Sequence, residues 1–320
     1  MMHALNYEGR AVCHWLSGAG LHCAVLEYRL VRLHPAPLLD ARRAVQLARA
    51  NSQAWHVDTV RIIVWASVRA ATWQATHVAL SWDIAAARAI DEGLQALGDR
   101  VAAQLSRPDA AVLAYPVVSA RNHSVGVLGQ PPHTCTSHAC VGRARRGEGR
   151  PIRHHGSIKV LLGARLGKYG VDEASVSLDE LASSTPRRRF RAPAPLFLWH
   201  TSADALVPVD NTLRLHAALL ARGGSVESHV FQGPLKHGLA LAHARLTRGK
   251  AIGRWPAMCL AWMARTIGIG VEVESADREH AISNRQMPPE GKRHCDRLAV
   301  DLRAALAAQR VFTISLNMHV

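Results

Sequence analysis

Residues 196–208 read Leu-Phe-Leu-Trp-His-Thr-Ser-Ala-Asp-Ala-Leu-Val-Pro, and this stretch decides the fold. Leu196 to His200 form a short apolar run with the length of a buried strand. Asp204 follows just past that run. Ligands of open parallel sheets bind beyond the carboxyl ends of the strands, so a carboxylate in this place is a candidate functional group.

Outward from this stretch, further apolar runs of strand length, and an alternating segment at 225–231, lie between segments of helical periodicity. Leu38, Ala41, Val45 and Ala48 recur at spacings of three and four, with Arg42, Arg43 and Arg49 off that face. This alternation predicts an α/β fold, a mostly parallel sheet with helices on both faces. The other predicted strands cover 22–28, 60–66, 110–118 and 225–231, and the other predicted helices cover 70–80, 211–221 and 255–265.

Length and composition set further limits. The chain has 320 residues, 48% of them hydrophobic and 20% charged, which is typical of a globular protein. It contains no apolar run of about 18 residues, so we expect no transmembrane helix. No secretory signal is visible at the N-terminus, so a cytoplasmic protein is expected. The six scattered cysteines indicate no disulfide framework, and Cys23 and Cys259 are expected to be small buried hydrophobes.

The net charge of +15 raises the question of nucleic-acid binding. Only five of the 39 basic residues are Lys, a ratio more typical of coding-DNA composition than of selection for phosphate contacts. More than half of the net charge lies within residues 121–191. We therefore expect no nucleic-acid partner, and a basic nucleic-acid-associated protein stays a minor alternative.

Three residues stand where an acyl-transfer site needs them. Ser67 directly follows the strand expected at 60–66, Asp204 follows the strand at 196–200, and His237 follows the strand at 225–231. This set supplies a hydroxyl nucleophile, an imidazole to take its proton and a carboxylate to hold the imidazole tautomer. The order Ser, Asp, His along the chain is that of α/β-hydrolases.

The chain resembles the α/β-hydrolase esterases of the acetyl-xylan-esterase and feruloyl-esterase-like group. The resemblance covers about residues 12–265, apart from 121–152, and its most specific part is Leu196 to Pro208. It implies carboxylic ester hydrolysis with Ser67 as nucleophile, His237 as base and Asp204 as its orienting partner, without a cofactor. Its other matching segments are Tyr28–Leu30, His34–Ala44, Arg107–Pro116 and His237–Leu239.

Two departures from that family bear on activity. The family's serine lies in a Gly-x-Ser-x-Gly-Gly turn, whereas Trp65, Arg69 and Ala70 occupy the flanking positions here. The family's Gly-rich oxyanion loop would precede the match, but the chain begins about ten residues before it, so we expect a truncated N-terminus. The Val68 N–H is then one oxyanion donor, and a second is missing. The sequence predicts an impaired esterase; the alternative is an inactive pseudo-hydrolase or gene remnant.

The remaining expectations concern organisation and partners. We predict an incomplete α/β-hydrolase domain over 1–267, with an irregular insertion at about 121–156, and a weakly ordered extension over 268–320. The cluster of His133, Cys135, His138 and Cys140 is too tightly spaced for a usual zinc site, so no metal is expected. The expected partner is a small-molecule or polysaccharide ester, with no membrane, and the oligomeric state is left open.

Overall fold

The computed structural model describes residues 5–29, 36–67, 85–117, 194–204, 207–221, 223–232, 237, 241, 250–268 and 312–317. Several expectations lie outside these residues: the helix at 70–80, the insertion at 121–156, the oxyanion donor Val68, and the cluster of His133, Cys135, His138 and Cys140.

The described strands form one parallel sheet. Its order is β1-β6-β2-β3-β4-β5, and every neighbouring pair is parallel. The predicted parallel sheet is therefore confirmed, and its five predicted strands end within a few residues of their predicted bounds. The strands are β1 (His22–Glu27), β2 (Ile62–Ser67), β3 (Ala110–Ala114), β4 (Leu196–Thr201), β5 (Val226–Phe231) and β6 (Phe312–Asn317).

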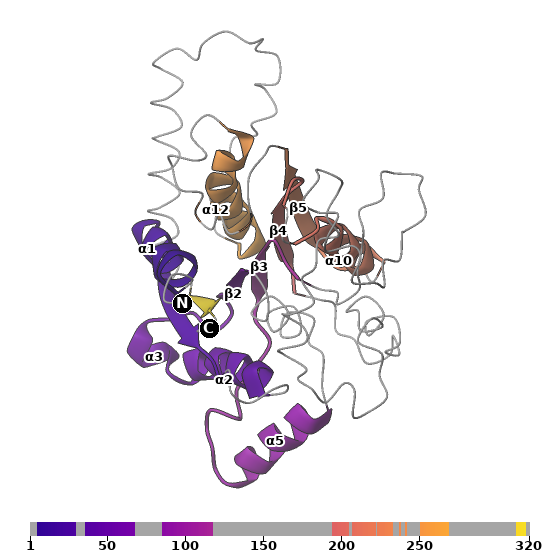
Figure 1. Ribbon diagram of the computed structural model, residues 1–320. Helices are drawn as coiled ribbons and strands as arrows, with labels where there is room; N and C mark the ends of the chain where they lie inside the picture. The colour runs from indigo at the N-terminus through magenta and orange to yellow at the C-terminus, as the bar shows by residue number, and fades with distance from the viewer. Residues whose placement is uncertain are drawn as a thin grey trace, which may run out of the picture.

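Strand β6 was not predicted, and it lies inside the sheet. It pairs with β1 on one side and β2 on the other, with Ile314 opposite both Ala24 and Val64. Figure 1 shows it in yellow beside the purple strands from the first part of the chain. Residues 312–317 of the expected extension thus belong to the sheet. The predicted boundary at residue 267 stays a prediction.

Helices cover both faces of the sheet, as predicted. On one face, Leu38 and Val45 of α2 and Leu215 of α10 pack in the same apolar cluster as Val64 and Leu198. On the other face, α1 and α12, whose ribbons are seen in Figure 1, contribute to a second apolar cluster with residues of β2, β3 and β4. The helices are η1 (Leu5–Arg10), α1 (Ala11–Gly18), α2 (Ala36–Ala50), α3 (Ser52–Trp55), α5 (Ala85–Ala96), α10 (Asp210–Leu220), η4 (Ala251–Arg254) and α12 (Trp255–Thr266).

Helix α2 follows its predicted pattern with one correction. All four residues of its predicted apolar stripe are buried, which fixes α2 against the sheet. Arg49, expected off that face, is buried as well. Its guanidinium donates to the carbonyls of Thr59, Leu105 and Arg107 and pairs with Asp109 at 2.9 Å. Arg49 therefore joins α2 to the chain segments that enter β2 and β3.

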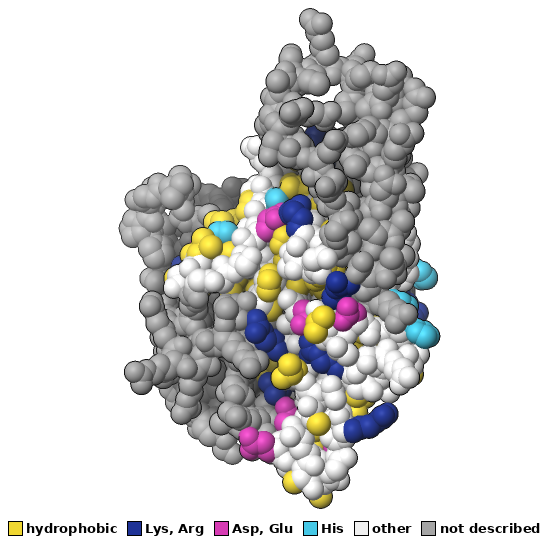
Figure 2. All heavy atoms as spheres, turned by 180° about the vertical axis from the view of Figure 1, so that it is seen from behind, with side chains coloured by type: hydrophobic (Ala, Val, Ile, Leu, Met, Phe, Trp, Pro, Cys, Tyr) yellow, Lys and Arg dark blue, Asp and Glu magenta, His cyan; other side chains and the backbone are white. Residues whose placement is uncertain are grey.

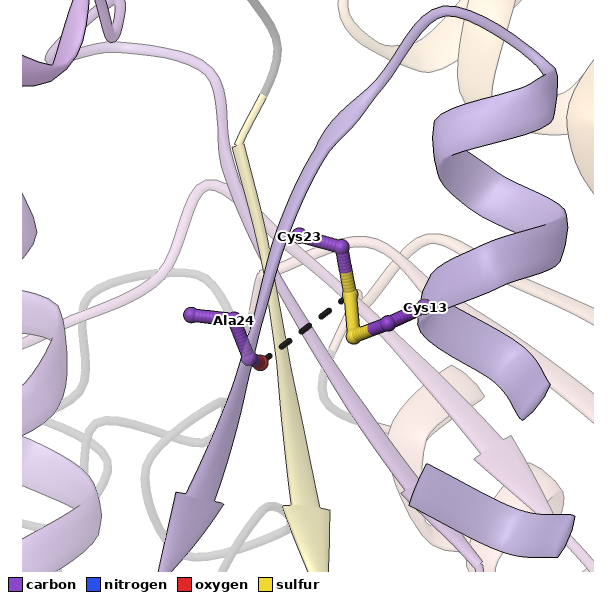
Figure 3. Close-up of a disulfide and its surroundings, with 3 residues drawn as sticks. All are labelled: Cys13, Cys23 and Ala24. Atoms are coloured by element: carbon purple, nitrogen blue, oxygen red, sulfur yellow. Dashed lines mark hydrogen bonds between the residues drawn. A yellow bond between two sulfur atoms is a disulfide. The ribbon is translucent and has the colours of Figure 1, made fainter. Parts of the chain in front are cut away.

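A disulfide joins the N-terminal helix to the edge of the sheet. Cys13 of α1 bonds to Cys23 of β1, and the Cys23 sulfur also lies 4.0 Å from the Ala24 carbonyl oxygen (Figure 3). The expectation that Cys23 is a small buried hydrophobe is wrong, because its position on the edge strand faces α1. Cys259 is a buried free thiol, as expected.

Charged side chains of both signs share the described surface. On the face in Figure 2, the Lys and Arg side chains in blue lie among Asp and Glu in magenta. Arg42 pairs with Asp91 and Arg43 with Asp99, so several guanidinium groups are neutralised locally. Among the helices of the described residues, none is long and apolar enough to cross a membrane.

Candidate active site

Asp204 and His237 meet at the carboxyl edge of the sheet. Asp204 lies in the turn after β4, and its side chain is almost fully buried. Its Oδ2 atom accepts a hydrogen bond from Nδ1 of His237 at 2.8 Å. Since Nδ1 carries the proton in this pair, the basic lone pair of a neutral His237 is on Nε2. The structure thus brings together two of the three predicted residues.

The Asp204 carboxylate has two further neighbours. Its Oδ1 atom accepts the backbone N–H of Val207 at 2.9 Å, and its Oδ2 atom lies 3.5 Å from Nε2 of His200. Burial alone would raise the pKa of Asp204, but the hydrogen bonds from His200 and His237, the charge of His237 and the Val207 N–H together hold that pKa well below its usual range. The carboxylate is therefore kept ionised, as an orienting partner for an imidazole must be.

His200 supports this carboxylate from inside the sheet. It is fully buried in β4, and its Nε2 also lies 3.0 Å from the Val207 carbonyl oxygen. Both neighbours of Nε2 accept hydrogen bonds, so Nε2 carries the proton and Nδ1 accepts from the Thr212 hydroxyl at 2.7 Å. Sequence reasoning missed His200 because it ends an apolar run that reads as pure core.

Ser67 lies on a neighbouring part of the same edge. It is the last residue of β2, opposite Ala114 of β3, and is 4% exposed. Among the described residues its hydroxyl has no hydrogen-bond partner, so it is not bonded to His237. Ser67 keeps the extended backbone of a strand, whereas a serine at a sharp strand-to-helix turn would leave it.

Trp65, which replaces the first glycine of the family turn, is a core residue. It is fully buried, and its ring lies 5.4 Å from that of Trp255 and 6.0 Å from that of Trp15. The indole belongs to the apolar cluster that α1 and α12 cover. Arg69 lies outside the described residues.

Tyr115 packs against His237. It follows β3 directly, and its ring lies 5.0 Å from the His237 ring at an interplanar angle of 68°. Its hydroxyl donates to Glu8 of η1 at 3.1 Å. The sequence offers one signal for Tyr115, its place at a strand end, and none for Glu8.

No cluster among the described residues has the ligand types and proximity to hold a metal ion. The prediction of a metal-free and cofactor-free site stays a prediction.

A parallel sheet with helices on both faces and an Asp–His pair beyond the carboxyl ends of its strands fits an α/β-hydrolase. No protein-family model matches the chain. Among solved structures, the chain is similar to an acetyl ester-xyloside bifunctional hydrolase from Caldicellulosiruptor lactoaceticus, at 29% identity and a TM-score of 0.54 over 81% of this chain and 76% of that one. The chain therefore has the α/β-hydrolase fold and resembles carboxylesterases.

Two further similarities are more distant. A carboxylesterase from Lactobacillus plantarum WCFS1 is 22% identical, with a TM-score of 0.54 over 81% of this chain and 79% of that one. A curated relative, endo-1,4-beta-xylanase B from Butyrivibrio fibrisolvens, is 22% identical over 255 residues, or 78% of this chain. The chain spans about a third of that relative's length, since the match covers 32% of it.

Proposed function

We propose that this protein hydrolyses carboxylic esters of small acyl groups such as acetyl, with Ser67, His237 and Asp204 as its catalytic residues and at a reduced rate. The observation that carries the proposal is the buried Asp204–His237 pair at the carboxyl edge of the sheet. The similarity to an acetyl-ester hydrolase supports the class of substrate. An ester on a polysaccharide fits the same chemistry.

In the proposed reaction, Ser67 Oγ attacks the carbonyl carbon of the ester while Nε2 of His237 takes the hydroxyl proton. The bond to the alcohol oxygen then breaks, and His237 returns the proton to that oxygen. Water attacks the acyl-serine by the same proton route and releases the acid. Asp204 holds His237 in the Nδ1–H tautomer and stabilises the imidazolium that forms.

A reduced rate follows from the state of Ser67. Its hydroxyl makes no hydrogen bond to the base within the described residues, and its extended backbone does not present it as a sharp turn would. A displacement of a reacting group by about 1 Å lowers the rate by about 10²-fold. The same observations favour the second candidate function, an inactive hydrolase fold that retains the Asp–His pair.

The test is hydrolysis of p-nitrophenyl acetate by the purified chain. We expect kcat to lie about 10²-fold below the usual enzyme range of about 1–10³ per second, and Ser67→Ala and His237→Gln to abolish the activity. Ser225→Ala is the matched control, because this exposed serine precedes β5 at the opposite edge of the sheet. Equal rates in all variants would support the inactive alternative.

A phosphonate ester probe adds a readout that is independent of turnover. It should label Ser67 in the unmodified chain and not in Ser67→Ala. A Trp65→Gly variant is unsuitable for restoring the family turn, since removing a buried Trp side chain costs about 3–5 kcal/mol of stability.

A further inference from the structure

Tyr115 has a backbone conformation that residues other than glycine rarely adopt. Its φ is +39°, in the left-handed region, although it precedes Pro116 and follows a regular strand. In a strand, consecutive side chains point to opposite faces. Ala114 and Tyr115 nevertheless belong to the same apolar cluster, so the unusual φ turns the Tyr115 ring onto the face of Trp199.

Three contacts hold the Tyr115 side chain and backbone once it is turned. Its N–H donates to the Trp199 carbonyl at 2.7 Å, and its ring meets the Trp199 ring edge-on at 4.9 Å. Its hydroxyl donates to the Glu8 carboxylate at 3.1 Å, and Tyr115 and Glu8 are 2% and 5% exposed. A non-glycine residue in this conformation persists only where its surroundings fix it, and such residues concentrate at functional sites.

The turned Tyr115 ring contacts the imidazole of His237. The imidazole turns about its Cα–Cβ and Cβ–Cγ bonds, and its 2.8 Å hydrogen bond to Asp204 favours one orientation of the ring. The Tyr115 ring, whose centroid lies 5.0 Å from that of the imidazole at an angle of 68°, packs against the imidazole and opposes rotation away from that orientation.

We propose that Tyr115 is a positioning residue that fixes the imidazole plane of His237, and that Glu8 of the N-terminal helix η1 holds Tyr115 in place. This inference rests on the proposed function, in which His237 is the general base. It also gives η1, which precedes the expected family match, a part in the site.

Four variants separate these contributions. Tyr115→Leu removes the ring, and Tyr115→Met is a second ring-free variant with more side-chain length. Tyr115→Phe keeps the ring and loses the bond to Glu8, and Glu8→Gln removes the carboxylate charge. The matched control is Ser225→Ala, because this exposed serine precedes β5 at the amino edge of the sheet. Thermal unfolding identifies the variants that fold.

The first readout is the low-field proton NMR resonance of the His237 Nδ1–H, assigned by its absence in His237→Gln. It reports the ring held against Asp204 and does not depend on turnover. We expect it to broaden or vanish in the folded ring-free variants, to weaken in Tyr115→Phe and Glu8→Gln, and to stay sharp in Ser225→Ala. An unchanged resonance in a folded ring-free variant would overturn the role of Tyr115, and an unchanged one in both Tyr115→Phe and Glu8→Gln would overturn that of Glu8.

The second readout is the split between kcat and KM for p-nitrophenyl acetate. The ring-free variants should lose about 10²-fold in kcat, since a displacement of about 1 Å has this effect, with KM unchanged. Tyr115→Phe, which keeps the ring, should lose less kcat than the ring-free variants. If the unmodified chain hydrolyses no ester, the proposed function fails, and the resonance alone still decides whether Tyr115 holds His237.

Discussion

Asp204 is the residue on which the predicted site depends most. His237, His200 and the Val207 N–H all converge on its two oxygen atoms inside a buried turn. Each of these contacts favours the ionised carboxylate, and together they outweigh the cost of its burial. A buried charge with three donors stabilises the fold as long as it is ionised, so its contribution to stability depends on pH.

We expect Asp204→Asn to lower the free energy of unfolding at pH 7 by roughly 2 kcal/mol. Because the folded pKa of Asp204 lies below its unfolded value of about 3.9, the stabilisation is present above that value and is lost as the pH falls below it. Urea unfolding at pH 7 and pH 3 should therefore show a smaller difference from the unmodified chain at pH 3. Asp210→Asn, which breaks a partly exposed pair with Arg214, should cost less than about 1 kcal/mol. If Asp204→Asn lowers the free energy of unfolding equally at both pH values, the ionised carboxylate does not stabilise the fold.

At this scale, strand-end position identified Asp204 and His237, because their chemistry and their place relative to apolar runs are both local. It could not identify Glu8, whose partner Tyr115 is 107 residues away in the chain. His200 was missed for another reason. The sequence does not distinguish a histidine that bonds to Thr212 and Val207 from an ordinary core residue when it lies inside an apolar run.

Among the elements, three of the five predicted strands share one property. Buried parallel strands read as continuous apolar runs, and β2, β3 and β4 are buried along their whole length. Strand β6 reads Phe-Thr-Ile-Ser-Leu-Asn, an alternation that is typical of a half-exposed strand. Thr313 and Ser315 are nevertheless fully buried. In β6, polar and apolar residues alternate, but buried and exposed residues do not.

The disulfide between α1 and β1 makes a prediction about these two elements. It closes a short loop, with a sequence separation of 10, for which chain-entropy arguments give about 2–3 kcal/mol of stabilisation. Cys13→Ser, Cys23→Ser and the double variant should lose the same free energy of unfolding, since each breaks the same bond. Reductant should destabilise the unmodified chain equally and leave the double variant unchanged. Additive losses in the single variants would show that the two sulfurs act separately.

At the scale of the whole molecule, the sheet joins sequence segments that are far apart. Strand β6 lies between β1 and β2, although nearly 250 residues separate β2 from β6 along the chain. Its Phe312 and Ile314 belong to the apolar cluster that also contains Leu38 of α2. The N-terminal part of the sheet is thus completed by the end of the chain.

Deletion of residues 312–320 should therefore unfold the whole domain rather than trim it. Without β6, the facing edges of β1 and β2 lose their hydrogen-bond partners, and Ile314, 2% exposed, leaves the core. The free-energy cost of the unpaired backbone groups and of the large cavity together exceeds the usual free energy of unfolding, which is about 5–15 kcal/mol. We expect the truncated chain to show no cooperative thermal transition. The matched control is deletion of residues 318–320, which keeps β6, and Ile314→Ala should lose about 2–5 kcal/mol with the transition preserved. A cooperative transition at an unchanged temperature in the 312–320 deletion would show that β6 is dispensable, and that the sheet closes between β1 and β2 without it.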